Sequence, residues 1–206
     1  MTISYPLTFP IQRTANFMLG LTPTVAVTKS VFTGTQQVYD WVNTPWSAAF
    51  DAIARGRAEW SALAAFVAKM RGQFGTVLIG PRHAVRPAGT CNTIGVTVGT
   101  GGAAALARSI PLAGLGASKT LLAGDFIQLG SGSTARLHMV TEDATANGSG
   151  EATVSIEPPL RASYLAAAAV TLIEPKVVMR SDVNLATIGP PNGGTISVSF
   201  SFSEAL

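Results

Sequence analysis

The chain has 206 residues, of which 47% are hydrophobic and only 12% are charged, and its formal net charge is +3. High apolar content with low net charge excludes intrinsic disorder, and the sequence has neither a collagen-like repeat nor a long heptad period. The one cysteine, Cys91, excludes an intramolecular disulfide.

The first third of the chain predicts several strands. Residues 3–10 alternate apolar and polar side chains, which is typical of a half-buried strand. Pro6 has no amide donor, so we expect this strand at a sheet edge. Residues 25–31 and 36–42 are separated by a glycine-containing turn and predict an antiparallel hairpin. Residues 45–53 predict a further strand.

One segment, residues 57–71, predicts a helix. Its apolar side chains recur at spacings of three and four and form a single stripe suited to packing on a sheet: Trp60, Leu63, Val67 and Met70. Gly72 follows the stripe, where a left-handed cap favours glycine. The short apolar run at 76–79 predicts a buried strand directly after the helix.

The middle of the chain has a different pattern. Residues 81–93 carry Pro81, Pro87 and Gly89 without periodicity and are interpreted as a linker. Short strands separated by glycine turns follow, and their spacing is typical of a small barrel or sandwich, of which we expect an OB-like β-barrel. These strands are residues 94–98, 109–112, 120–122, 125–130, 135–141 and 152–156. The alanine-rich residues 161–169 predict a short helix or a loop packed on the barrel.

The end of the chain returns to strands. Residues 176–180 are strand-like, 188–194 form a long turn, and 195–203 alternate apolar with serine or threonine residues. Because the first and last segments share this alternation, we expect them in one domain. The predicted fold is mainly β with one main helix. Residues 1–83 and 175–206 form a belt-like β-sandwich, and residues 84–174 are inserted as the barrel.

No catalytic or metal-binding motif stands out. Asp125 and His138 are the most plausible pair for an unrecognised hydrolase, because they lie on neighbouring predicted strands. Cys91 with His83 or His138 is a weaker thiol pair, and the carboxylates at 142–143 are interpreted as a solvated turn. The sequence therefore predicts no catalytic, cofactor-binding or metal-binding residue, and a protein that is not an enzyme.

The charge distribution points to protein partners. Between residues 87 and 135 only Arg108, Lys119 and Asp125 are charged, and charge depletion is typical of surfaces buried against other subunits. The positive residues of the first half lack the interleaved aromatics and reading module of a nucleic-acid site. They are Arg55, Arg57, Lys69, Arg71, Arg82 and Arg86. No sequence-specific nucleic-acid binding is predicted.

Three segments carry a family resemblance. Residues 59–73 (EWSALAAFVAKMRGQ) lead into the strand at 76–79, and this helix with its R-G-Q exit resembles that of the distal tail, or minor tail, proteins of siphophage-like tailed phages. Residues 122–130 (LAGDFIQLG) resemble a further run of the same family. So does the stretch from Val140 through residues 152–161.

This resemblance implies a structural role in a virion. Distal tail proteins form a hexameric ring that joins the tail tube to hub or fibre proteins, next to the tape measure protein. We therefore expect a homo-oligomeric ring in a phage tail tip, assembled in the cytoplasm of the host bacterium. The terminal strands would offer edges for pairing with a neighbour. Passage of DNA through the ring is left open.

The alternatives belong to other functional classes. A host-surface carbohydrate-binding module would need exposed aromatic platforms, yet residues 84–174 contain only Phe126 and Tyr164 as aromatic residues. A membrane protein would need an apolar span of about 20 residues. The longest apolar stretch, residues 165–173, is shorter than that. The N-terminus also lacks the pattern of a signal peptide.

Overall fold

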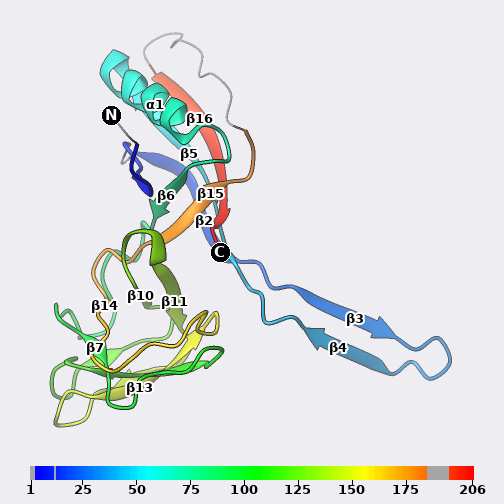
Figure 1. The fold of residues 1–206 in the computed structure, drawn as a ribbon, viewed down its shortest axis with the longest axis vertical. Coiled ribbons are helices and arrows are strands. Elements are labelled where there is room, and N and C mark those ends of the chain that lie inside the picture. Colours follow the sequence, from blue (N-terminus) through cyan, green and yellow to red (C-terminus); the bar gives the residue numbers. More distant parts are fainter. Residues whose placement is uncertain (1–2, 12, 185–194) are drawn as a thin grey trace.

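The computed structural model describes residues 3–11, 13–184 and 195–206 (Figure 1). It confirms the expected fold class, with 41% strand, one helix, a sheet formed by both chain ends and a nearly closed, six-stranded barrel-like sheet. The turn expected at 188–194 lies outside the described residues. The elements are β1 (Leu7–Thr8), β2 (Thr14–Leu21), β3 (Val25–Lys29), β4 (Gln36–Asp40), β5 (Trp46–Arg55), α1 (Gly56–Met70), β6 (Thr76–Ile79), β7 (Thr97–Val98), β8 (Ser109–Ala113), β9 (Thr120–Leu121), β10 (Phe126–Leu129), a short 3₁₀ turn (Gly132–Thr134), β11 (Arg136–Val140), β12 (Ala144–Thr145), β13 (Ala152–Glu157), β14 (Val170–Thr171), β15 (Val177–Ser181) and β16 (Thr195–Glu204).

The sheet formed by the chain ends has the strand order β1-β6-β15-β16-β5-β2. β1 runs parallel to β6 at one edge, and the other neighbouring strands pair antiparallel. The last strand, β16, lies between β15 and β5 and pairs with β5 from Thr195 to Ser203. Its pairing with β15 covers only Phe202–Glu204, so along residues 195–200 that edge of β16 carries no paired strand among the described residues. The expectation that the terminal strands offer an edge to a neighbouring subunit therefore stays a prediction.

The first strand is much shorter than expected from its alternation. The sequence predicts residues 3–10, but only Leu7–Thr8 pairs with the sheet. The Tyr5 hydroxyl donates a hydrogen bond to the Lys69 carbonyl at 2.6 Å, and its ring packs edge-on against Phe74. The residues before Leu7 therefore follow the end of the helix instead of the sheet.

The core lies between this sheet and α1. The predicted alternation is confirmed in β5 and β16, where Trp46, Phe50 and Phe202 are buried. Phe9, just after β1, packs its ring within 5.1–5.4 Å of three other phenylalanine rings: Phe50, Phe66 and Phe200. The helix contributes Leu63, Phe66, Val67 and Met70 to the same cluster. Burial of this aromatic cluster holds β1, α1 and the last strand together.

The helix ends one residue earlier than expected. α1 ends at Met70, and Arg71 takes the left-handed cap conformation with φ 50° and ψ 50°. Gly72, where the sequence predicts the cap, follows with φ +65°. Two successive residues of positive φ turn the chain sharply back toward β6, and only the second is a glycine.

Replacing Gly72 with alanine is expected to lower the free energy of unfolding by roughly 1–2 kcal/mol. The new Cβ would lie 2.5 Å from the Asn184 Oδ1 atom, at a φ that alanine adopts poorly. Arg71→Gly is the matched variant, and we expect it to raise stability slightly because glycine relieves the left-handed cap. Urea unfolding of both variants measures this, and equal stabilities would contradict the explanation.

Strands β2 to β5 form one interrupted ribbon. β2 pairs with β5 in the sheet, and β3 pairs with β4 in a separate two-stranded sheet. The link between them is continuous, because Thr22 N donates to Pro45 O at 2.9 Å and Trp41 N to Thr24 O at 3.3 Å. We call residues 22–45 the arm. The arm projects from the body of the molecule, with β3 and β4 far from either large sheet (Figure 1).

The sequence did not indicate β2 because its pairing is irregular. Asn16 has a φ of 50°, and the register with β5 shifts between Ala15 and Met18. A β-bulge of this kind breaks the two-residue period on which strand prediction depends. It also twists the exposed edge of the sheet, which discourages further strands from pairing there.

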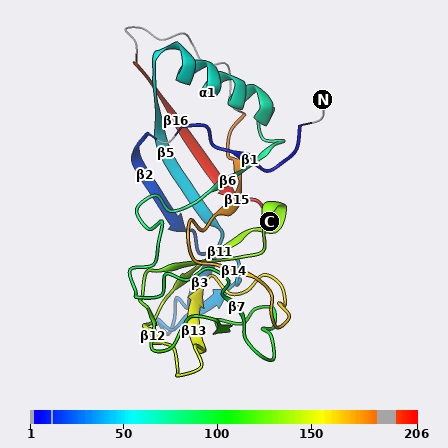
Figure 2. The same ribbon diagram turned by 90° about the vertical axis from the view of Figure 1, so that its left-hand side faces the viewer.

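The middle of the chain folds as the expected small barrel. Its main sheet has the order β14-β10-β11-β13-β8-β7, and a bridge between Thr97 and Ala169 brings the two ends of the sheet together. All strands of this sheet lie between residues 97 and 171. Residues 161–169 form a loop with isolated bridges at Tyr164 and Ala169, and not a helix. The barrel lies against the end of the chain-end sheet opposite the helix (Figure 2).

Candidate functional site

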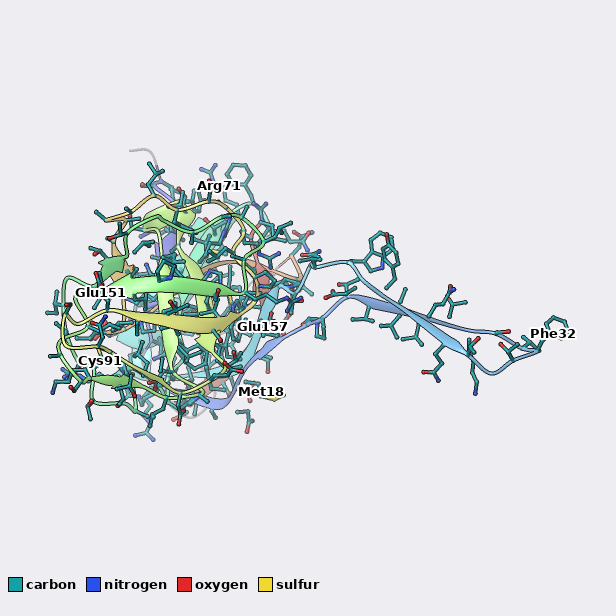
Figure 3. All side chains as sticks on the ribbon, turned by 90° about the horizontal axis from the view of Figure 1, so that it is seen from below. Met18, Phe32, Arg71, Cys91, Glu151 and Glu157 are labelled. Atoms are coloured by element: carbon teal, nitrogen blue, oxygen red, sulfur yellow. The ribbon has the colours of Figure 1, made fainter. Side chains whose placement is uncertain are left out.

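The arm exposes both faces of its two-stranded sheet. All residues of β3 and β4 are exposed. The register places Val25, Val27 and Val38 on one face, which we call the valine face and which also carries Lys29 and Asp40 at its ends. Ala26 and Tyr39 lie on the other face. The tip carries Phe32, which is 98% exposed and marks the end farthest from the body (Figure 3). Exposed apolar surface of this extent on one projecting element indicates an interaction surface.

The isolated arm has little to stabilise it. An isolated two-stranded hairpin is only marginally stable in water and needs a third strand or a packed layer. Within the described part of the chain, neither face of β3 or β4 receives such a layer. Val27 is 59% exposed and Val38, directly opposite, is 64% exposed. The arm therefore exposes valines that a third strand or a packed layer would normally cover.

Two arginines of the barrel fasten the base of the arm. Arg108 forms an ion pair with Asp40 at 3.1 Å. Arg161 donates to the Asn43 side chain at 3.2 Å and to the Thr44 carbonyl at 3.0 Å. These contacts direct the arm relative to the barrel, although exposed ion pairs such as that of Arg108 contribute little stability by themselves.

A buried polar cluster lies behind this base, between the chain-end sheet and the barrel. The Glu204 carboxylate, at the end of β16, accepts a hydrogen bond from Arg161 at 3.3 Å and from the Trp46 backbone N at 3.2 Å. Arg136 of β11 lies 4.0 Å from the same carboxylate and donates to the Ala205 carbonyl at 2.7 Å. The Trp46 indole donates to the Leu137 carbonyl at 2.7 Å. This cluster joins the last strand to the inserted barrel.

His138 of β11 is fully buried beside this cluster. Its Nδ1 lies 2.7 Å from the Pro158 carbonyl oxygen, so the neutral ring donates there from Nδ1. Burial lowers the pKa of His138 from 6.5 to about 4, and the positive charges of Arg161 and Arg136 act in the same direction. His138 is therefore neutral in the folded protein at physiological pH.

Acidification is expected to destabilise the fold through His138. Because the folded state holds the pKa near 4 while the unfolded chain titrates near 6.5, protonation favours unfolding. The contribution is fully present above about pH 6.5 and is lost as the pH falls to about 4, in total about 3 kcal/mol. Urea unfolding at several pH values should show this loss, and His138→Gln should flatten it. Exposed His83→Gln is the control, and an unchanged slope in His138→Gln would contradict the assignment.

The structure gives Asp125 and His138 separate partners. The Asp125 carboxylate accepts hydrogen bonds from the backbone N–H groups of Ala88 at 2.6 Å, Gly89 at 3.3 Å and Leu122 at 2.8 Å. Asp125 thus fastens the linker at 81–93 to the barrel. With these backbone contacts and the Pro158 contact of His138, the geometry favours structural roles for both residues over a hydrolase pair.

The other candidate residues from the sequence lie apart from one another, in the barrel core, the linker and a surface turn. Cys91 is fully buried in the barrel core, with its Sγ atom 3.4 Å from the Leu115 carbonyl oxygen, whereas His83 is exposed in the linker. Glu142 accepts a hydrogen bond from Ser155, and Asp143 from the Ala123 N–H. Among the described residues, no group of three or more His, Cys, Asp or Glu side chains could hold a metal ion.

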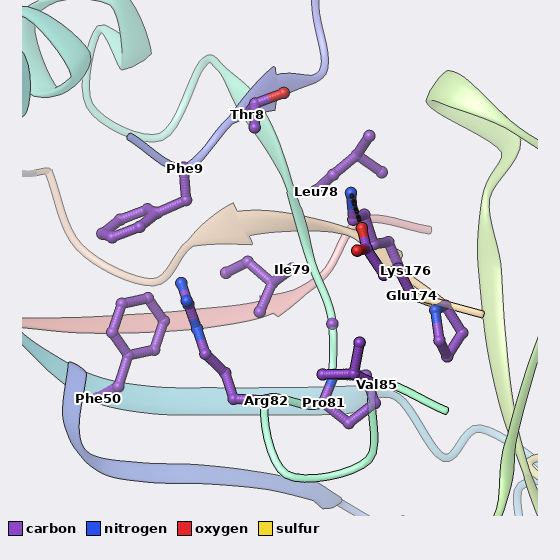
Figure 4. A pocket seen from close by; sticks show the side chains of 12 residues that line it. Thr8, Phe9, Phe50, Leu78, Ile79, Pro81, Arg82, Val85, Glu174 and Lys176 are labelled. Carbon is purple, nitrogen blue, oxygen red and sulfur yellow. Dashed lines mark ion pairs between the residues drawn. The ribbon is translucent and has the colours of Figure 1, made fainter. Parts of the chain in front are cut away.

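One pocket of about 340 Å³ lies between the chain-end sheet and the linker (Figure 4). Arg82 extends into it beside Phe50 and Ile79, and its guanidinium donates to the Ile11 carbonyl at 3.1 Å. Lys176 and Glu174 at the rim lie 3.9 Å apart as an ion pair. Since these charged side chains have partners within the chain, the pocket is better explained as a packing seam than as a catalytic site.

The aromatic residues of the barrel do not form an exposed platform. Phe126 is 7% exposed and packs 5.7 Å from the Trp46 ring, and Tyr164 is half-buried. The exposed aromatic pair is on the arm, where the ring centroids of Tyr39 and Trp41 lie 5.5 Å apart. The sequence predicts the hairpin that carries this pair but not its projection. The sequence feature that could have indicated this projection is the presence of apolar side chains on both faces of the hairpin.

The comparisons with known proteins leave the family open. A scan against protein-family models finds no match, and a search of curated proteins finds none either. Within the described residues, no helix combines the length and apolar character needed to cross a membrane.

Proposed function

We propose that this protein is a ring-forming structural subunit of a phage tail tip, a distal tail protein that joins the tail tube to hub or fibre proteins. It works by assembly and not by catalysis. Identical copies make repeated contacts that close into a ring, for which six copies are expected. Its place is the virion tail, beside the tube, tape measure and hub or fibre proteins, after assembly in the bacterial cytoplasm.

The arm is the observation that carries this proposal. A projecting hairpin with exposed valines on one face and aromatic side chains on the other is only marginally stable by itself and gains stability when another surface covers it. Enzymes and small-molecule binders need a concave site, whereas the arm is convex and uncharged over most of its length. The resemblance of residues 59–73 and 122–130 to distal tail proteins supports the same role.

Solution mass and tail incorporation test this function. Six copies of the 21.2 kDa chain give about 127 kDa by light scattering after size exclusion. Some rings close only on a template, so the protein is also added to tail tube and hub proteins and followed by electron microscopy. A protein that remains monomeric and enters no tail under either condition would overturn the proposal.

A charged substitution in the arm tests whether the arm takes part in assembly. Val38→Asp places a charge where the proposed contact is apolar, so we expect association to weaken by roughly a hundredfold or more. Val183→Asp is the matched control, because Val183 is also exposed but lies outside the arm. Light scattering across a concentration series measures both. Equal association by the two variants would show that the arm takes no part.

A sugar-binding role is the second candidate, favoured by the exposed pair Tyr39 and Trp41. These side chains are 67% and 61% exposed, and such aromatic faces can stack on apolar sugar faces. A glycan array tests it, with Trp41→Ala expected to abolish any signal. Phe74→Ala changes a similarly exposed aromatic away from the arm and serves as the control. An array with no bound glycan would count against this role.

A further inference from the structure

The chemistry of the arm limits what can cover it. Between residues 22 and 45 the only charged residues are Lys29 and Asp40, which lie at opposite ends of the valine face. Asp40 already forms an ion pair with Arg108, so the middle of that face, around Val27 and Val38, is uncharged. Nucleic acid and anionic lipid headgroups are bound through clusters of basic side chains, which the arm lacks. An uncharged apolar surface is the complementary partner.

The same chain carries such a surface on the barrel. It consists of residues 99–107 and 162–169, which contain no charged residue and which we call the double loop. The two segments are joined by reciprocal backbone hydrogen bonds of 2.8 Å between Ala103 and Tyr164. Leu106 and Leu165, one from each segment, are 64% and 83% exposed. Small alanine side chains around these leucines leave room for a flat ribbon to approach closely.

The backbone of the double loop holds its apolar side chains outward at some conformational cost. Leu106 and Ala167 both have a φ of 65°, which non-glycine residues rarely adopt. The Leu106 N–H is fixed by the Leu160 carbonyl at 2.7 Å, and the Ala167 N–H by the Val98 carbonyl at 2.9 Å. Backbone strain of this kind is kept where it serves a function, and here it holds the Leu106 side chain outward.

The double loop also lies beside the base of the arm. Arg108 directly follows its first segment and Arg161 directly precedes its second, and these two arginines bind Asp40 and Asn43 at the arm's base. A neighbouring copy whose arm covers the double loop would therefore place its arm next to the base of this one. The contact can then repeat from copy to copy in one direction, as a heterologous ring contact requires.

We propose that the double loop is the docking surface for the valine face of the arm of a second copy of this chain. The proposal rests on the function proposed above and names the surfaces that the ring contact uses. The valines of the arm would cover Leu106 and Leu165 of the neighbour, and the double loop would supply the packed layer that the isolated hairpin lacks.

Site-specific photo-crosslinking in the full chain tests this contact. Val38 is replaced by benzoylphenylalanine, and the labelled protein is mixed with an isotopically heavy copy so that crosslinks between copies are recognised by mass. We expect crosslinks between copies from position 38 to residues 99–107 or 162–169. The same photo-reactive residue at exposed Val183 is the control and should give none to the double loop.

A charge pair provides the second measurement. Leu165→Lys should weaken association by about tenfold or more, as a charge buried in an apolar contact does. Ile94→Lys is the matched control, because Ile94 is an equally exposed apolar residue of the barrel outside the double loop. Mixing Leu165→Lys with Val38→Asp should restore part of the association, since the opposite charges would then meet across the contact.

The outcomes separate this inference from the proposed function. Crosslinks to the double loop of another copy, together with rescue by the charge pair, support both. An oligomer whose crosslinks from position 38 map elsewhere, or fall within one copy, overturns the docking surface and leaves the ring in place. A chain that gives no crosslinks between copies, remains monomeric and enters no tail overturns both.

Discussion

Replacing Trp46 with alanine is expected to lower the free energy of unfolding by about 4 kcal/mol. Trp46 begins β5 and is 2% exposed, with its ring against Phe126 of the barrel. Truncation leaves a large cavity, and it also removes the indole donor from the Leu137 carbonyl at 2.7 Å. Since Phe126 and Leu137 belong to the barrel, the loss falls on the contact that joins the two parts of the fold.

Trp41→Ala is the matched control for this effect. It removes the same side chain from the arm, where Trp41 is 61% exposed, so we expect a change within about 0.5 kcal/mol. Urea unfolding followed by circular dichroism measures both variants without relying on tryptophan fluorescence. Similar losses in the two proteins would mean that the arm is covered in the monomer, contrary to the structure.

Replacing Glu204 with alanine is expected to lower the free energy of unfolding by about 3–5 kcal/mol. Its side chain is 1% exposed and is the shared partner of Arg136 and Arg161, whose side chains are themselves largely buried. Removing the carboxylate leaves two positive charges close together without compensation. The Trp46 backbone N–H also loses its acceptor.

Glu151→Ala controls for the loss of one acidic residue, because Glu151 is exposed in a loop of the barrel. Its stability should change by no more than about 0.5 kcal/mol in urea unfolding. The Trp46 indole and the Glu204 carboxylate hold neighbouring residues of β11, Leu137 and Arg136, so the losses in a Trp46→Ala, Glu204→Ala double variant should not be additive. Additive losses would show that the cluster does not act as one unit.

Local periodicity explains why much of the fold could be predicted. The alternation of residues 195–203 matches β16, and the apolar stripe of residues 57–71 matches α1 apart from its ends. The spacing of glycine turns located the strands of the barrel to within a few residues, including 135–141 for β11 and 152–156 for β13. In each case the pattern reflects burial of one face, which neighbouring residues in the sequence record directly.

The sequence predicts the hairpin of the candidate site but not its exposure. Residues 25–31 and 36–42 were correctly interpreted as a hairpin, because a turn and β-forming residues are local signals. Val25 and Val27 alternate as they would in a half-buried strand, so the sequence could not reveal that both faces of the arm are exposed. Exposure depends on which other segments come near, and the chain-end sheet ends before the arm begins.

The sequence by itself determined the mostly β composition, the single main helix, the interrupted order of the segments and the absence of a catalytic motif. These follow from patterns within about ten neighbouring residues. Only the tertiary structure decided that the arm stands clear of the body and that β16 lies between β15 and β5. Only it brings Glu204 to Arg136 and Arg161, residues distant in the chain. The physical reason is that burial and ion pairing depend on distance in space, whereas periodicity depends on distance along the chain.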